Sequence, residues 1–154
     1  MAKLLRQKLS VFRLQKNAEI DPVIKERLAQ TAIDSMASAY APYSKFQVGA
    51  AILAPNGKIF AGCNVENAAY PVGSCAEAGA ISAMVLAGHV VIEAIAVAGY
   101  GEALCTPCGG CRQRIREFAA AHTPIFICDE NGVRQTTSLG ELLPLSFGPD
   151  NLTN

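Results

Sequence analysis

Cysteine and glutamate residues with the potential for chemistry stand in two short stretches of the sequence. The stretch CTPCGGC, residues 105–111, contains two overlapping C-x-x-C spacings. The stretch CAE, residues 75–77, supplies another cysteine and a carboxylate. Cysteines at C-x-x-C spacing serve as redox dithiols, as ligands of structural zinc or as ligands of catalytic zinc. The three kinds of site differ in the other residues that they need.

A redox dithiol and a structural zinc site each explain part of this pattern. A thioredoxin-like C-x-x-C motif follows a strand and opens a helix, which the flanking sequence allows, but it gives the CAE stretch no role. A structural site would use Cys75, Cys105, Cys108 and Cys111. It would crowd three ligands into one turn and leave Glu77 without a function. Both interpretations remain open from these residues alone.

A catalytic zinc site accounts for both stretches. Thiolates from Cys75, Cys108 and Cys111 would hold one zinc ion per chain and leave the fourth tetrahedral position to water. Each cysteine stands at the head of a predicted helix, whose partial positive charge helps to offset the charge of three thiolates. Glu77 follows a ligand by two residues, so it can reach that water without binding the metal. This hypothesis makes Glu77 the catalytic residue.

Composition limits the class of protein and its partners. The chain has 154 residues, of which 51% are hydrophobic, and this is enough for one domain with a core. Lys plus Arg number 13, and Asp plus Glu also number 13. The chain therefore has no net positive charge that would attract a nucleic acid, and no such partner is expected. No apolar run reaches the roughly 18–20 residues that span a bilayer, so no membrane partner is expected. Six cysteines without a secretory pattern favour a reducing compartment, and we expect a cytoplasmic protein.

Residues 1–17, MAKLLRQKLSVFRLQKN, read as a basic N-terminal extension. They contain no Asp or Glu, and their apolar residues recur at loosely helical spacing. Such a stretch resembles a transit peptide, but it is not rich in serine, which favours a plain terminal extension. The remaining residues, 18–154, are predicted to form a single domain.

The first predicted elements are a helix and a hairpin. Asp21 and Pro22 have the residue types of an N-cap and a first helical position, and the helical spacing of apolar residues continues to about Tyr40. Strands at 46–54 and 59–63 then flank an Asn-Gly pair, which tolerates the positive φ of a tight turn. Cys63 ends the second strand and is expected to be an ordinary core thiol.

Helices and strands alternate after the hairpin. The predictions are a helix at 75–88 with Ser74 as N-cap, a strand at 91–100, a helix at 109–122, strands at 124–128 and 133–137, and a short helix that begins with a capping box between Ser138 and Glu141. Cys128 ends a strand and is expected to be a second core thiol. Apolar strands separated by helices imply an α/β fold in three layers, α/β/α, around a mixed sheet of about five strands.

Several motifs occur in an order that resembles a known enzyme family. CAE followed by PCGGC is similar to the metal site of zinc-dependent nucleobase deaminases. The wider match consists of YAPYSKFQVGAA, GCNVENAAY, SCAEAGA, TPCGGCRQ and ELLPLSFG. Together these segments resemble the small oligomeric cytidine deaminases of nucleoside salvage over residues 40–148. The resemblance implies a cytidine deaminase-like fold for the domain.

The resemblance also implies a reaction and a substrate site. The implied reaction is hydrolytic deamination of cytidine or deoxycytidine to the uracil nucleoside and ammonia. Water activated at the zinc adds to carbon 4 of the ring, while Glu77 moves protons to ring nitrogen 3 and to the leaving amine. In this family Phe46 would line the base pocket and the backbone at Ala76 would hold the base. Asn64 and Glu66 would bind the ribose hydroxyls.

Two aromatic residues imply that the protein forms oligomers. Tyr70 matches a family tyrosine that lies near the sugar at a subunit junction. Phe147 matches an aromatic residue that closes the pocket of a neighbouring subunit. The resemblance therefore implies a homotetramer, with a homodimer as the alternative, and a nucleoside as the small-molecule partner.

Ala78 departs from the family pattern. Many members have arginine after the catalytic glutamate, where its charge offsets the ligand thiolates, so here Arg112 or the helix N-termini would have to compensate. This departure leaves two other functions open. One is deamination of a modified cytosine nucleoside, as in blasticidin-type deaminases, although the pair Asn64 and Glu66 argues against it. The other is a non-catalytic, zinc-stabilised oligomer, in which Glu77 would have no role.

Overall fold

A five-stranded mixed sheet organises the chain. The computed structural model describes residues 19–152, so the predicted extension at residues 1–17 lies outside it. The strand order is β2-β1-β3-β4-β5, in which β3 and β4 are parallel and the other neighbours antiparallel. The strands are β1 Val48–Leu53, β2 Ile59–Cys63, β3 Ala94–Gly99, β4 Pro124–Asp129 and β5 Gly132–Ser138. The predicted mixed sheet is confirmed.

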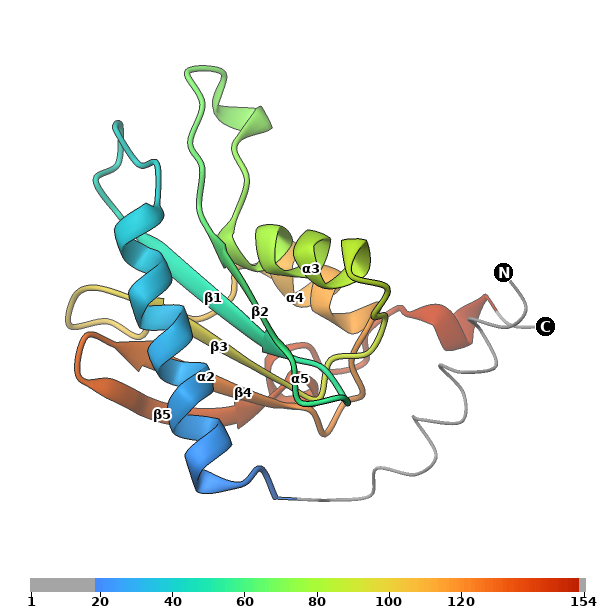
Figure 1. Ribbon diagram of the computed structural model, residues 1–154. Helices are drawn as coiled ribbons and strands as arrows, with labels where there is room; N and C mark the ends of the chain where they lie inside the picture. Colours follow the sequence, from blue (N-terminus) through green and yellow to red (C-terminus); the bar gives the residue numbers. More distant parts are fainter. Residues whose placement is uncertain (1–18, 153–154) are drawn as a thin grey trace.

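Helices cover both faces of this sheet, which confirms the three-layer α/β/α prediction (Figure 1). Helix α2 packs on one face, and α3 and α4 pack on the other. The helices are α2 Pro22–Ser35, α3 Ala76–Leu86, α4 Gly109–Arg116 and α5 Leu139–Leu142, with 3-10 turns at Met36–Ser38, Tyr70–Val72 and Pro149–Asn151. Within residues 19–152, none of the helices has the length and apolar character that a bilayer crossing requires.

Alternate residues of the central strands face two separate cores. In β3, Ile95 and Val97 pack against α3 and α4, whereas Ala94, Ala96 and Ala98 face α2. Successive side chains of a strand point to opposite faces, so both faces must be apolar when both are covered. This explains why the sequence of β3 is apolar throughout.

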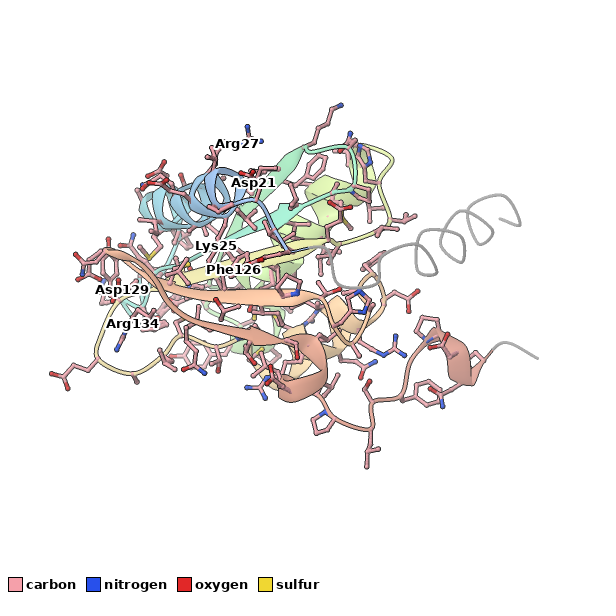
Figure 2. The ribbon with its side chains drawn as sticks, turned by 90° about the horizontal axis from the view of Figure 1, so that it is seen from below. Asp21, Lys25, Arg27, Phe126, Asp129 and Arg134 are labelled. Carbon is pink, nitrogen blue, oxygen red and sulfur yellow. The ribbon has the colours of Figure 1, made fainter. Side chains whose placement is uncertain are left out.

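Lys25 links α2 to the far edge of the sheet. Its ammonium group lies 4.8 Å from the centre of the Phe126 ring in β4 and donates a hydrogen bond of 3.3 Å to the Thr136 hydroxyl in β5 (Figure 2). An ammonium over an aromatic face is attracted by the negative charge of the ring face. The contact helps to fix α2 across the strands.

Two predicted helices end earlier than expected because their last residues pair elsewhere. The first helix stops at Ser35 and its 3-10 turn at Ser38, since the backbone of Tyr40 bonds to residues 64 and 66. Helix α4 stops at Arg116, not at residue 122, since the carbonyl of Phe118 accepts a hydrogen bond from Ile92 N. Because Ile92 makes this bond, β3 begins at Ala94 and not at residue 91. Strand β1 begins at Val48 and not at residue 46.

Gly62→Ala is expected to destabilise the protein because α3 lies directly on this residue of β2. An added Cβ would lie 2.3 Å from the Ala80 nitrogen and 2.4 Å from the Ala76 carbonyl oxygen. Both are backbone atoms, so the whole helix would have to move. We expect the free energy of unfolding to fall by about 1–3 kcal/mol in urea titrations.

Gly79→Ala is the matched control for this substitution. Gly79 lies in α3 opposite Gly62, but a Cβ there would meet its nearest neighbour at 3.6 Å, which is ordinary contact. Alanine also favours the helix over glycine, so this variant should be as stable as the wild type or more so. Equal destabilisation by the two alanines would show that the close helix–strand contact is not the cause.

Candidate active site

The N-terminal ends of α3 and α4 meet at one edge of the sheet. Strands β2 and β3 are both antiparallel to β1, so they run in the same direction and end at the same edge. Helix α3 follows β2 along the chain, and α4 follows β3. The carboxyl ends of such strands are where open α/β sheets place their ligand sites. This topology brings residues 75–77 next to residues 105–111.

Three cysteine sulfurs form a cluster between the two helix ends. The Sγ atoms of Cys75, Cys108 and Cys111 all lie within 4.8 Å of one another, and those of Cys75 and Cys108 are 3.9 Å apart. Zinc–sulfur bonds of about 2.3 Å in a tetrahedron hold sulfurs about 3.8 Å apart. The donor atoms and their spacing therefore fit one zinc ion per chain. Within residues 19–152 Cys105 is not part of this cluster, which argues against the four-cysteine site.

Cys75 and Cys108 are the N-cap residues of α3 and α4. Neither side chain caps its helix with a hydrogen bond, so the first N–H groups of each helix are available to stabilise negative charge at the sulfurs. The prediction of Ser74 as N-cap was wrong. The backbone of Ser74 exchanges two hydrogen bonds of 2.8 Å with Val65, so the helix can begin only after Cys75.

Glu77 is a buried carboxylate beside the cluster. Its exposed fraction is 4%, and the Cys111 thiol donates a hydrogen bond of 3.3 Å to its Oε2. Glu77 also lines the pocket above the cluster, so its carboxylate can reach a molecule bound there. A carboxylate held between metal-binding sulfurs and a pocket is well placed for proton transfer.

Burial and hydrogen bonding give the three thiols different pKa values. Burial raises the pKa of Cys75 and of Cys111 above the usual thiol value. Burial acts in the same direction on Cys108, but hydrogen bonds with Cys111 and Cys75 outweigh it and lower the pKa of Cys108. Zinc binds thiolates, so metal binding must displace protons from Cys75 and Cys111.

A pocket of about 670 Å³ opens above the cluster, a size suited to a small molecule. Most of the predicted site residues line it: Phe46, Asn64, Glu66, Tyr70, Cys75, Ala76, Glu77 and Cys108. Two predicted residues do not line it. Cys111 is buried and does not reach the pocket surface. Phe147 lies on the C-terminal segment, away from the pocket of the same chain.

Asn64 fixes the start of β1 and with it the position of Phe46. Its Oδ1 accepts a hydrogen bond of 2.8 Å from Val48 N, and its Nδ2 donates one of 2.8 Å to the Phe46 carbonyl. An amide side chain has two donor hydrogens and two acceptor lone pairs. One donor and one lone pair of Asn64 therefore remain for a ligand.

Glu66 holds the loop before Phe46. Its carboxylate accepts hydrogen bonds from Tyr43 N at 2.8 Å and from Ser44 N at 3.2 Å, and another from the Ser44 hydroxyl. The bond from the Ser44 hydroxyl, with the two backbone bonds, lowers the pKa of Glu66. No role was predicted for Tyr43 and Ser44, although both stand in the YAPYSKF motif, because their partner Glu66 is distant in the chain.

Residues 22–127 match the family described as "Cytidine and deoxycytidylate deaminase zinc-binding region". The chain belongs to this family. It is 40% identical over 128 residues to a protein named cytidine deaminase from Sporosarcina psychrophila, covering 83% of this chain and 94% of the relative. A cytidine deaminase of Mycobacterium tuberculosis H37Rv is 41% identical over 126 residues, covering 81% and 90%.

Solved structures of the deaminase family have the same fold. The crystal structure of cytidine deaminase from Burkholderia pseudomallei superposes with a TM-score of 0.75 at 41% identity, covering 79% of this chain and 97% of the other. The cytidine deaminase of Mycobacterium tuberculosis gives a TM-score of 0.70 at 35% identity, covering 84% and 99%. These relatives favour neither alternative that Ala78 left open, the modified nucleoside or the non-catalytic oligomer.

Tyr70 stands on the 3-10 turn of an extended arm, residues 64–74. Its ring meets the Tyr43 ring edge-on, with centroids 5.9 Å apart and an angle of 61° between the planes. Although Tyr70 lines the pocket, 76% of it is exposed in the single chain. The Tyr70 side of the pocket in this deaminase is therefore open to solvent in the single chain.

Cys105 lies in the wall of the pocket, a place that its sequence context did not predict. It lines the cavity next to Thr106, and its sulfur packs so closely on Gly99 that a Cβ there would lie 2.7 Å from it. Burial raises the pKa of Cys105 to about 11, so the thiol stays neutral at physiological pH. Cys105 is part of the pocket wall but does not belong to the cysteine cluster of this family member.

Arg112 anchors the loop that carries Cys108. Its guanidinium donates to the Pro107 carbonyl at 2.7 Å, to the Leu142 carbonyl at 2.9 Å and to the Thr106 hydroxyl at 3.4 Å. All three acceptors are neutral oxygens, so the guanidinium keeps its positive charge beside the loop of Cys108. Arg112 and the uncapped helix N-termini can both contribute positive potential where many family members have an arginine at position 78.

Proposed function

We propose that the protein is a zinc-dependent aminohydrolase that converts cytidine and deoxycytidine to uridine and deoxyuridine with release of ammonia. The observation that carries this proposal is the buried carboxylate of Glu77 between a three-cysteine zinc site and a pocket of nucleoside size. Relatives named cytidine deaminase over most of the chain support it. We place the reaction in pyrimidine salvage in the cytoplasm.

In the proposed reaction, Glu77 carries the protons. Bound zinc supplies a Lewis acid that lowers the pKa of water to near neutrality. Glu77 takes a proton from the attacking water and delivers it to ring nitrogen 3 while the new C–O bond forms at carbon 4. It then passes the second proton of that water to the amine, the C–N bond breaks, and ammonia leaves. Cys75, Cys108 and Cys111 hold the metal throughout.

The pocket lining favours a nucleoside over a nucleotide. Its described lining residues include no Lys, Arg or His, whereas Glu66 and Glu77 are both carboxylates. A phosphate group would meet negative charge there without a cationic partner. We propose that Phe46 and the backbone of Ala76 hold the base and that Asn64 and Glu66 bind the sugar hydroxyls.

Glu66→Gln is expected to impair the turnover of nucleosides much more than the turnover of the free base. Glutamine keeps the size of the side chain and one acceptor for the loop, but it loses the charge that strengthens a hydrogen bond to a hydroxyl. We expect kcat/KM for cytidine to fall by about 10–100-fold and that for free cytosine to change by less than about threefold. Steady-state kinetics on the two substrates check this. An equal fall for both would mean that Glu66 only orders the loop.

We also propose that the active form is a homotetramer, or failing that a homodimer, in which Tyr70 and Phe147 complete the sugar side of the site. Two features support this proposal. Tyr70 lines the pocket yet remains mostly exposed, and Phe147 is an exposed aromatic outside its own pocket. Exposed aromatic side chains of this kind are common at protein interfaces.

Ammonia release from the purified, metal-analysed protein tests the proposed function. The substrates are cytidine, deoxycytidine, cytosine, deoxycytidine monophosphate and several modified cytosine nucleosides. We expect turnover of the first two with about one zinc per chain, and little turnover of the nucleotide. Turnover of a modified nucleoside alone would redirect the assignment, and zinc without turnover of any substrate would contradict it.

A further inference from the structure

After α5, the chain leaves the sheet and runs along α4. We call residues 143–150 the C-terminal strap. Gln113 Nε2 donates a hydrogen bond of 3.0 Å to the Phe147 carbonyl. Arg116 donates from Nε to the Ser146 hydroxyl at 3.0 Å and from Nη2 to Asp150 Oδ2 at 3.0 Å. One face of α4 therefore holds the strap at three points.

The strap presents apolar side chains outward. Leu145 is fully exposed and has a φ of 50°, a left-handed conformation that a leucine adopts only when its surroundings impose it. Phe147 is 59% exposed. A backbone that accepts this strain in order to turn apolar side chains to solvent is expected to serve a contact with another molecule.

Arg116 occupies the space that a side chain at position 148 would need. A Cβ added to Gly148 would lie 2.5 Å from the Arg116 Cζ and 2.7 Å from its Nη2. The φ of Gly148 is −160°, an extended conformation open to any residue, so the need for glycine here is steric. The guanidinium therefore lies flat against the strap backbone, directly after Phe147.

We propose that Arg116 is a positioning residue, whose clamp on the strap sets the direction in which Phe147 projects toward the pocket of a second copy of this chain. The inference rests on the proposed function, which places Phe147 at that pocket. The pocket wall that a second copy would complete is the exposed side at Tyr70. Helix α4 would then have two roles. Its N-terminal end carries Cys108 and Cys111 of the metal site in the same chain, and its C-terminal end carries Arg116, which holds the strap.

Kinetics of Arg116→Met and Gly148→Ala test this role. Methionine removes the guanidinium, and alanine pushes it off Ser146 and Asp150 without removing it. For both variants we expect the KM for deoxycytidine to rise on the order of tenfold, kcat to change by less than about threefold, and zinc content and oligomer mass to be unchanged. Arg116→Lys, which retains the charge and one donor, should recover part of the loss.

Arg27→Met is the matched control. Arg27 donates a hydrogen bond of 3.2 Å to the Gly57 carbonyl at the β1–β2 turn, on the side of α2 shown in Figure 2. Its loss should leave KM unchanged. Unchanged KM in Arg116→Met and Gly148→Ala would overturn the proposal, and so would a loss of zinc or of the oligomer in both, because these would be signs of a general structural role.

A fluorescence measurement separates this proposal from the proposed function. The chain contains no tryptophan, so Phe147→Trp introduces a single reporter. We expect its emission to be blue-shifted, and to move to the wavelength of an exposed tryptophan when Arg116→Met or Gly148→Ala is added. Unchanged emission in both double variants would refute the positioning role. If the wild-type protein turns over no nucleoside, the proposed function is rejected. A shift of the tryptophan emission in the double variants would still support the positioning role of Arg116 in that case.

Discussion

Glu77→Gln is expected to remove nearly all turnover while leaving the zinc in place. Glutamine has the size of glutamate but cannot carry a proton between water, ring nitrogen and leaving amine. We expect kcat to fall by about 10³–10⁴-fold, at the upper range for general acid–base catalysis. The side chain is buried with an exposed fraction of 4%, so removing its charge should not lower stability. Stopped assays and metal analysis of one preparation measure both quantities.

The control for this prediction is Glu102→Gln, an exposed carboxylate outside the pocket lining. It should retain wild-type kcat and zinc. If Glu77→Gln released the metal, Glu77 would be a zinc ligand, and the proton-transfer role would have to be given up. If it kept both metal and turnover, another group would have to carry the protons.

Cys108→Ala is expected to release the zinc and abolish activity, whereas Cys105→Ala should retain the metal. Cys108 Sγ lies 3.9 Å from Cys75 Sγ within the cluster, while Cys105 packs against Gly99 in the pocket wall. With two sulfurs left, the affinity for zinc should fall by more than about a hundredfold. Competition with a chromophoric chelator measures this affinity, and thermal unfolding with and without chelator reports the stability linked to the metal.

Cys105→Ala separates the metal site from the pocket wall. The loss of a partly buried sulfur should alter substrate affinity modestly, while zinc stoichiometry stays at about one per chain. Equal loss of zinc from Cys105→Ala and Cys108→Ala would restore the four-cysteine site. Zinc loss from neither variant would refute the cluster as the metal site.

Local sequence determined several elements because their stabilising contacts lie within a few residues. The Asp21 side chain accepts hydrogen bonds from Val23 N and Ile24 N, as its place before Pro22 predicts. Ser138 and Glu141 form the predicted capping box. Gly57 in the Asn-Gly turn has a φ of 77°. Each of these contacts joins residues only a few positions apart, so residue type and spacing suffice to predict them.

The donor set of the metal site was also determined by sequence. Three cysteines and one glutamate at these spacings, each near a predicted helix start, allowed a zinc site with Glu77 beside it. The family resemblance then favoured the catalytic zinc site over the redox dithiol and the four-cysteine site. The chemistry of thiolate and carboxylate groups is a property of the residues themselves, so it can be read without coordinates.

Only the tertiary structure decided where these groups lie and what else holds them. Helix α3 begins after Cys75 because Ser74 pairs with Val65, and α4 ends at Arg116 because Phe118 bonds to Ile92. Other contacts of this kind also join residues that are distant in the chain. They are the hydrogen bonds of Glu66 with the loop before Phe46 and the clamp of Arg116 on the strap. The place of Cys105 in the pocket wall depends on such contacts. Their free energy depends on the folded arrangement of the sheet and helices, which no local pattern encodes.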